Sequence, residues 1–244
     1  MLLTRATSVV VATLALLGAG PLRSDALTAL GASASETPAY KAPQHLTPRA
    51  RVGGGLRGAG GDDPAVAALV PDHVGITVKQ YPELNWFLSK RTSLPIQFTL
   101  IEERSIEALV EQSITAPETA GVQAIKLSDM NVALQPNVQY RWYVSLIRDT
   151  GSPSRNIVTG GMIERCDFSE CLALDATTTC SPEAVILSAA NGFWYDAMGC
   201  VSDLIQTNPE DIGLRKQRAA LLKQVGLHDV AEWDLSPAHA RRFP

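Results

Sequence analysis

The stretch LQPNVQYRWYVSLIRDTGSP, residues 134–153, decides the fold of this chain. Between Tyr140 and Leu146 large apolar side chains alternate with polar ones, which is the pattern of a strand that buries one face. The side chains expected on the buried face are Tyr140, Trp142, Val144 and Leu146. Arg141 and Tyr143 are expected on the opposite face. The Asp-Thr-Gly-Ser-Pro sequence that follows predicts a turn.

The segment just before this strand, Leu134 to Tyr140, resembles the tyrosine corner of immunoglobulin-like and fibronectin type III sandwiches. In those sandwiches the tyrosine hydroxyl forms a hydrogen bond with the backbone of the preceding segment. In this chain, Trp86 is expected to fill the core against Trp142. Similar alternation predicts strands at Gly75–Lys79, Leu84–Ser89, Ile96–Glu102, Ile106–Ile114, Gly121–Ser128, Gln139–Arg148 and Ile157–Arg165. We therefore interpret residues 66–165 as a β-sandwich of this type.

After Cys180 the apolar period becomes helical, and residues 181–234 are expected to form a helical cap. The expected helices are 182–190, 193–206, 210–225 and a short one at 230–233. Six residues have the spacing of one tetratricopeptide-type repeat: Gly192, Trp194, Ala197, Val201, Leu204 and Pro209. A single repeat cannot bury its own face, so we expect a helical hairpin packed on the sandwich, in an α+β protein. Arg215, Lys216 and Arg218 are interpreted as a solvated face.

The chain begins with a segment typical of a signal peptide. Arg5 precedes an apolar run that ends at Gly20, and small residues near Ala26 suit cleavage, which gives residues 1–26 as the leader. The alternative is an uncleaved N-terminal anchor. Residues 27–65 are rich in Ala, Ser, Pro and Gly and predict a flexible linker, and residues 235–244 predict a frayed tail.

One glycine pattern and four cysteines need separate interpretation. Gly53, Gly55 and Gly58 fit a dinucleotide-binding pattern, but no strand precedes them and no helix follows, which favours a flexible glycine tract. The arginines around it, Arg49, Arg51 and Arg57, could dock on an acidic partner. Export would place the cysteines in an oxidising compartment, where two disulfides are expected without a defined pairing. The cysteines, three in the loop 166–180, are Cys166, Cys171, Cys180 and Cys200.

Composition and motif content exclude several classes of function. The chain is 45% hydrophobic with a formal net charge of −4, so it is neither a disordered chain nor a basic, nucleic-acid-binding one. Its four histidines lack metal-binding spacing, and no nucleophile-elbow motif occurs. We therefore expect no catalytic residue, no metal and no cofactor.

Six ordered motifs resemble the DUF928 family of bacterial proteins of unassigned function. They are RVGGGLRG (51–58), LVPDHVGITVKQYPELNWFL (69–88), IQFTLIEE (96–103), YRWYVSLIRD (140–149), GGMIER (160–165) and NGFWYDAM (191–198). The resemblance covers residues 51–233 and implies an exported protein without established catalytic residues. Members often lie near genes for sensors with extracytoplasmic CHASE2 domains, which implies an accessory role in the envelope. The cysteine loop looks like an elaboration of this chain.

These observations predict a periplasmic or secreted, non-catalytic binding or accessory module. It would contact an envelope protein, such as a CHASE2-type sensor, and would not be an integral membrane protein after cleavage of the leader. The residues expected to form the contact surface are Arg141, Tyr143, Arg148, Glu164, Trp194 and Asp196. An exposed aromatic among residues 193–195 would mark this patch. The alternatives are a secreted hydrolase with a dispersed site, or a glycan-binding module that uses Trp86 or Trp194.

Overall fold

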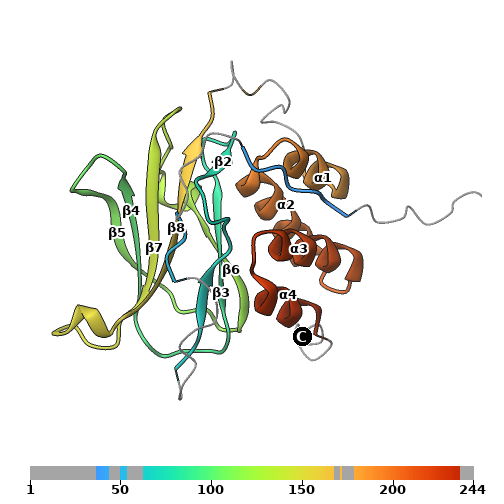
Figure 1. The fold of residues 1–244 in the computed structure, drawn as a ribbon. Helices are drawn as coiled ribbons and strands as arrows, with labels where there is room; N and C mark the ends of the chain where they lie inside the picture. Colours follow the sequence, from blue (N-terminus) through green and yellow to red (C-terminus); the bar gives the residue numbers. More distant parts are fainter. Residues whose placement is uncertain (1–36, 44–49, 54–62, 168–170, 172–178, 237–244) are drawn as a thin grey trace, which may run out of the picture. The chain divides into compact units, whose positions relative to one another are not determined.

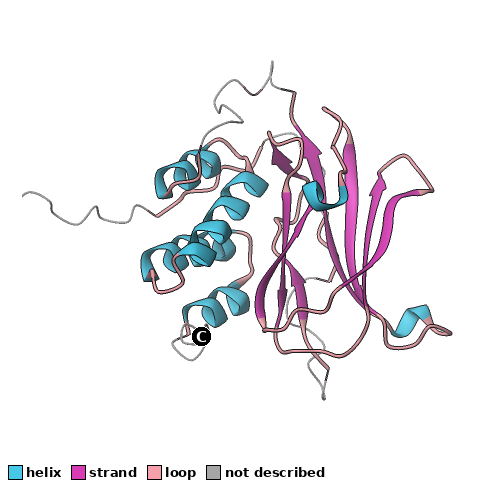
Figure 2. Cartoon of the chain, turned by 180° about the vertical axis from the view of Figure 1, so that it is seen from behind, coloured by secondary structure: helices cyan, strands magenta, loops and turns pink. Residues whose placement is uncertain are grey.

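The computed structural model describes residues 37–43, 50–53, 63–167, 171 and 179–236. Within these residues the chain is an α+β protein, with eight strands in two sheets followed by four helices (Figures 1 and 2). The leader predicted at residues 1–26, with the alternative of an anchor there, lies outside the described residues, as do residues 237–244 of the predicted tail.

The smaller sheet has three antiparallel strands in the order β1-β3-β6. These strands are β1 (Val66–Ala68), β3 (Glu83–Leu88) and β6 (Gly121–Lys126). The sequence did not predict β1, because a three-residue strand is too short to show a period. In the register, Asn85 of β3 lies opposite Ala124 of β6.

The larger sheet has five strands in the order β2-β8-β7-β4-β5. Its strands are β2 (Gly75–Thr77), β4 (Ile96–Glu102), β5 (Ala108–Ile114), β7 (Gln139–Leu146) and β8 (Ile157–Arg165). Strands β2 and β8 run parallel, and the other neighbours are antiparallel. Two short 3-10 helices lie in the connections, at Leu127–Met130 and Pro153–Arg155. The seven predicted strands are confirmed, with small shifts at their ends.

One continuous core joins the two sheets. The four side chains predicted on the inner face of β7 are buried, and Trp86 and Trp142 belong to the same buried cluster. All six residues of β3 are buried, because one face of this strand meets the core and the other meets the helices. The backbone N–H of Gln135 donates a hydrogen bond of 3.1 Å to the Tyr140 hydroxyl, so the predicted bond from this tyrosine to the chain before it is present.

The helices are α1 (Pro182–Ala190), α2 (Trp194–Thr207), α3 (Ile212–Gln224) and α4 (His228–Leu235). Each packs against the next, and α2 also packs on β2 and β3 (Figure 1). The Ser181 hydroxyl accepts the Ala184 N–H at the start of α1, and the Asp211 carboxylate accepts two N–H groups at the start of α3. These caps satisfy backbone donors that a helix leaves unpaired at its first turn.

The predicted flexible linker differs from the structure in two stretches. In residues 37–43, the ring of Tyr40 stacks on His73 and meets Trp194 edge to face, and Tyr40 N–H donates to Gln224. In residues 50–53, Arg51 donates to the carbonyls of Val70 and Val225, and Val52 pairs with Gly160. Arg51 therefore points into the fold, where burial lowers its pKa, and not toward an acidic partner. Arg49, Arg57, Gly55 and Gly58 lie outside the described residues.

Candidate functional site

A pocket of about 460 Å³ lies between the three-stranded sheet and the helices. Its walls come from β3 and the loop after it, from the start of β6, and from α2, α3 and α4. We call it the sheet–helix pocket. Its volume falls in the range of small-molecule sites in proteins, which is roughly 300–1,000 Å³.

Two buried arginines and one buried aspartate form the polar part of this pocket. Arg218 donates from Nε to Oδ2 of Asp234 at 2.8 Å and from Nη2 to Oδ1 at 2.6 Å, and from Nη1 to the Ser202 hydroxyl at 3.3 Å. Arg215 donates to Oδ1 of Asp234 at 3.4 Å and twice to the Pro209 carbonyl. The side chains of Arg215, Arg218 and Asp234 are 7%, 6% and 1% exposed, respectively.

The prediction of a solvated arginine face on α3 is therefore wrong for Arg215 and Arg218, whereas Lys216 is exposed. A signal for this burial was present in the sequence. Arg218 lies four residues after Leu214 and three before Leu221, so it falls within the apolar stripe of the helix. The sequence around Asp234 does not indicate its burial, because the arginines that pair with it lie on the preceding helix, α3.

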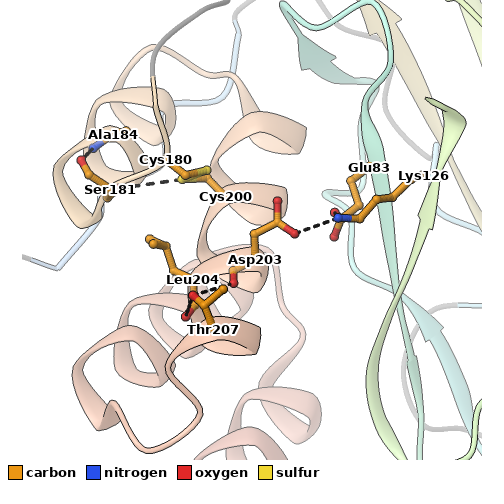
Figure 3. The surroundings of a disulfide bond; sticks show 9 residues. All are labelled: Glu83, Lys126, Cys180, Ser181, Ala184, Cys200, Asp203, Leu204 and Thr207. Atoms are coloured by element: carbon orange, nitrogen blue, oxygen red, sulfur yellow. Dashed lines mark hydrogen bonds and ion pairs between the residues drawn. A yellow bond between two sulfur atoms is a disulfide. The ribbon is translucent and has the colours of Figure 1, made fainter. Parts of the chain in front are cut away.

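A line of polar contacts beside the pocket begins at Asn85, the residue of this line that is in the pocket lining. Asn85 donates from Nδ2 to Oε1 of Glu83 at 2.6 Å, and Lys126 lies 3.4 Å from Oε2 of Glu83. Lys126 also donates to Asp203 of α2 at 3.0 Å (Figure 3). Burial raises the pKa of Glu83, and the hydrogen bond to Asp203 raises the pKa of Lys126. This line ties the sheet to α2 and fixes the amide of Asn85.

An aromatic wall closes the pocket beside these polar groups. Trp233 of α4 meets Phe87 of β3 edge to face, with ring centroids 5.0 Å apart. Gly121, at the start of β6, has φ +125°, and a Cβ there would lie 3.0 Å from the Trp233 ring. Both the backbone conformation and the close approach favour glycine at this position.

The predicted contact residue Trp194 and the two aromatic residues beside it lie inside the protein. Phe193, Trp194 and Tyr195 are 5%, 0% and 3% exposed, and all three face the junction between helices and strands. The Trp194 indole donates to the Leu69 carbonyl at 2.8 Å. None of the three is the exposed aromatic that would mark a contact patch, and neither Trp194 nor Trp86 (1% exposed) offers a surface platform for a glycan.

Asp196, also predicted as a contact residue, is buried and forms hydrogen bonds inside the fold. Its carboxylate accepts the Thr77 hydroxyl at 3.2 Å and the Val78 N–H at 3.0 Å. Burial raises its pKa to about 6, against the opposing effects of Lys79 and of these hydrogen bonds. Because Asp196 is 5% exposed, a partner at the surface does not reach it.

The other predicted contact residues remain accessible but do not form one cluster. Arg141 pairs with Glu103 on the five-stranded sheet, where Tyr143 is half-buried on the same strand face. Arg148 pairs with Asp63 at the other end of β7. Glu164 accepts a hydrogen bond from Gln139 at 2.8 Å and lines a smaller hollow of about 220 Å³.

The four cysteines form two disulfides. Cys166 pairs with Cys171, and Cys180 pairs with Cys200, with Cα–Cα distances of 6.3 and 5.4 Å. The second bond ties the segment before α1 to the middle of α2 (Figure 3). Disulfides persist in oxidising compartments, so the pairs are consistent with an extracytoplasmic protein.

In the part of the chain that the structure describes, no group of three or more His, Cys, Asp or Glu side chains could hold a metal ion. None of the described helices is long and apolar enough to cross a membrane.

Comparison with known proteins identifies the family. The family model for the Domain of Unknown Function DUF928 matches residues 52–235, from Val52 to the end of α4. The chain belongs to the DUF928 family. Among curated proteins no match is found. The matched region includes both sheets, all four helices and every element that lines the sheet–helix pocket, so the pocket is built from the DUF928 region itself.

Proposed function

We propose that this DUF928 protein is an exported, non-catalytic binding module of the bacterial envelope, and that it binds a small ligand in the sheet–helix pocket. The observation that carries the proposal is the pocket itself, of about 460 Å³, with Arg215, Arg218, Asp234 and Asn85 in its lining. Such a combination of an aromatic wall and a few placed polar groups is typical of ligand sites. The two disulfides support a periplasmic or secreted location.

We further propose that ligand binding serves an accessory role toward an envelope protein, such as a CHASE2-type sensor. The predicted contact residues that remain accessible are Arg141, Tyr143, Arg148 and Glu164, of which Arg141 is paired with Glu103 on the five-stranded sheet. Capture of an envelope protein by the wild-type chain, and its loss in Arg141→Ala but not in Arg155→Ala, would support this role. Equal capture by both variants would contradict it.

We also propose that the fold is an immunoglobulin- or fibronectin-like sandwich with a tetratricopeptide-type helical hairpin. The strand orders β1-β3-β6 and β2-β8-β7-β4-β5, together with the Tyr140 hydrogen bond, support the first. Sequential packing of α1 to α4 supports the second. Superposition of an experimental structure on domains of both types tests each assignment.

The ligand-binding function is tested by blocking the pocket. Ala120 lies at the pocket wall and is partly exposed, so Ala120→Trp fills the entrance with little strain on the core. The matched control is Ala108→Trp on the outer strand β5. A thermal-shift screen of small molecules should find compounds that raise Tm in the wild type and the control but not in Ala120→Trp. If every stabilising compound acts equally on Ala120→Trp, the pocket is not the binding site.

A further inference from the structure

The charges that line the sheet–helix pocket do not balance. Among the described residues, two buried guanidinium groups, of Arg215 and Arg218, share the single carboxylate of Asp234. Removing a charge from water without a counter-charge is strongly unfavourable, and buried charges are therefore normally paired. The arrangement favours an additional anion at this position.

The two arginines also have hydrogen-bonding capacity for such an anion. A guanidinium carries five N–H groups. The hydrogen bonds described above engage three N–H groups of Arg218 and three of Arg215. Donors therefore remain on both residues, in a planar arrangement that matches a carboxylate or phosphate group.

The edge of the pocket adds positive charge. Lys90 and Arg91, in the loop after β3, are exposed and line the same pocket. Among the described residues that line its edge, Glu118 is the one acidic side chain. Exposed cations at the entrance of a cleft raise the local concentration of anions and speed their association.

Asn85 defines a second requirement for the ligand. This side chain is 2% exposed and lines the pocket, and its Oδ1 has no hydrogen-bond partner among the described residues. The bond from Nδ2 to Glu83 fixes which end of the amide faces the glutamate, so Oδ1 is the end left for another group. A buried acceptor without a partner is unfavourable. A ligand donor at this position would remove that cost.

The cations that line the same pocket decide the nature of this donor. An ammonium group beside Arg215 and Arg218 would be repelled, whereas a hydroxyl donates without charge. We propose that the sheet–helix pocket selects a small hydroxylated organic anion, an inference that rests on the proposed binding function. The carboxylate or phosphate of this anion would accept hydrogen bonds from Arg215 and Arg218, and its hydroxyl would donate to Oδ1 of Asn85.

Isothermal titration of the full chain with four probes tests this selection. Glucuronate and malate supply the carboxylate on a sugar and on a hydroxy acid, glucose 6-phosphate supplies the phosphate, and glucose is the uncharged control. We expect at least one anionic probe to bind more than about tenfold more tightly than glucose. The order of affinity among the three anions shows whether the pocket prefers a carboxylate or a phosphate, and whether it prefers a sugar or a hydroxy acid. Glucose binding as tightly as all three, or no binding by any anion, would overturn the inference.

Two sets of variants then locate the bound anion. Lys90→Gln with Arg91→Gln should weaken binding by roughly three- to tenfold, because each exposed charge contributes modestly. The matched control, Arg104→Gln with Arg155→Gln, removes two exposed arginines elsewhere and should leave affinity unchanged. Asn85→Leu should weaken binding by about tenfold or more, since a hydroxyl loses its acceptor.

The outcomes separate this inference from the proposed function. An uncharged compound that binds the wild type, fails to bind Ala120→Trp and is insensitive to the charge variants would overturn the inference while the binding function stands. An anion that binds Ala120→Trp as well as it binds the wild type would overturn both. Circular dichroism of each variant confirms that the fold is retained.

Discussion

Arg218 holds Asp234 through two parallel hydrogen bonds, Nε to Oδ2 and Nη2 to Oδ1, and so fastens α3 to α4 inside the protein. The geometry is the bidentate one in which guanidinium and carboxylate planes match. Because both side chains are almost fully buried, breaking this pair would leave two charges with little solvation. The pair therefore sets the position of α4, which carries the Trp233 wall of the sheet–helix pocket.

Removing the carboxylate should destabilise the protein strongly. In Asp234→Ala both arginines lose their buried counter-charge, and we expect the free energy of unfolding in urea to fall by about 3–5 kcal/mol. The control Asp203→Ala, whose side chain is 41% exposed, should cost less than about 1 kcal/mol. The double variant Arg218→Met with Asp234→Leu should recover only part of the loss, because Arg215 stays buried without its counter-charge. Equal effects of Asp234→Ala and Asp203→Ala would contradict this account of the pair.

A second buried contact joins α2 to the five-stranded sheet. The Tyr195 hydroxyl accepts the Trp142 indole N–H at 2.8 Å and donates to the Met162 carbonyl at 2.9 Å. Tyr195→Phe leaves the indole N–H unpaired in the core, which should lower the free energy of unfolding by about 1–3 kcal/mol.

The control for this contact is Tyr143→Phe, a half-buried tyrosine on the same strand as Trp142. It should change stability by no more than about 0.5 kcal/mol. Urea titration at one pH measures both variants. A loss in Tyr195→Phe as small as that in Tyr143→Phe would show that the indole finds another acceptor.

Local patterns predicted the elements well but not the contacts between them. Strand β4 was predicted with its observed ends, because its alternation of apolar and polar residues reports a single buried face. Strand β3 is buried on both faces, and nothing in its sequence shows that helices cover the second one. Asn85 and Asp234 line the same pocket only because of this packing, so the periodicity of either segment does not predict the pocket. The charge of the α3 arginines favours a solvated face, whereas the position of Arg218 between Leu214 and Leu221 places it in the buried stripe.

The pairing of cysteines is a separate prediction. Mass mapping under non-reducing conditions should find Cys166 bound to Cys171 and Cys180 bound to Cys200. The second bond closes a sequence separation of 20 residues, against 5 for the first. Chain entropy then predicts a loss of about 3 kcal/mol for Cys180→Ser with Cys200→Ser, and about 2 kcal/mol for the other pair. Peptides that link Cys171 to Cys180 would contradict this pairing.

Asp196 makes stability depend on pH. Its pKa is about 6 in the folded protein against an ordinary 3.8, so the folded chain holds this proton more tightly than the unfolded chain. The contribution to stability is therefore full below pH 3.8, falls as the pH rises and is lost above pH 6. Across this range it amounts to about 3 kcal/mol. Asp196→Asn removes the titration, so the variant should gain stability relative to the wild type as the pH rises from 4 to 7.

A second variant checks that the pH dependence comes from this carboxyl group. Thr77→Val keeps the shape of a fully buried side chain but removes the hydrogen bond to Asp196 that holds its pKa down. The pKa of Asp196 should then rise further, and the fall in stability should move to higher pH. Urea titrations in half-unit pH steps measure both curves. If the difference between Asp196→Asn and the wild type stays constant over this range, the carboxyl group does not titrate there, and its two hydrogen bonds outweigh the cost of burial.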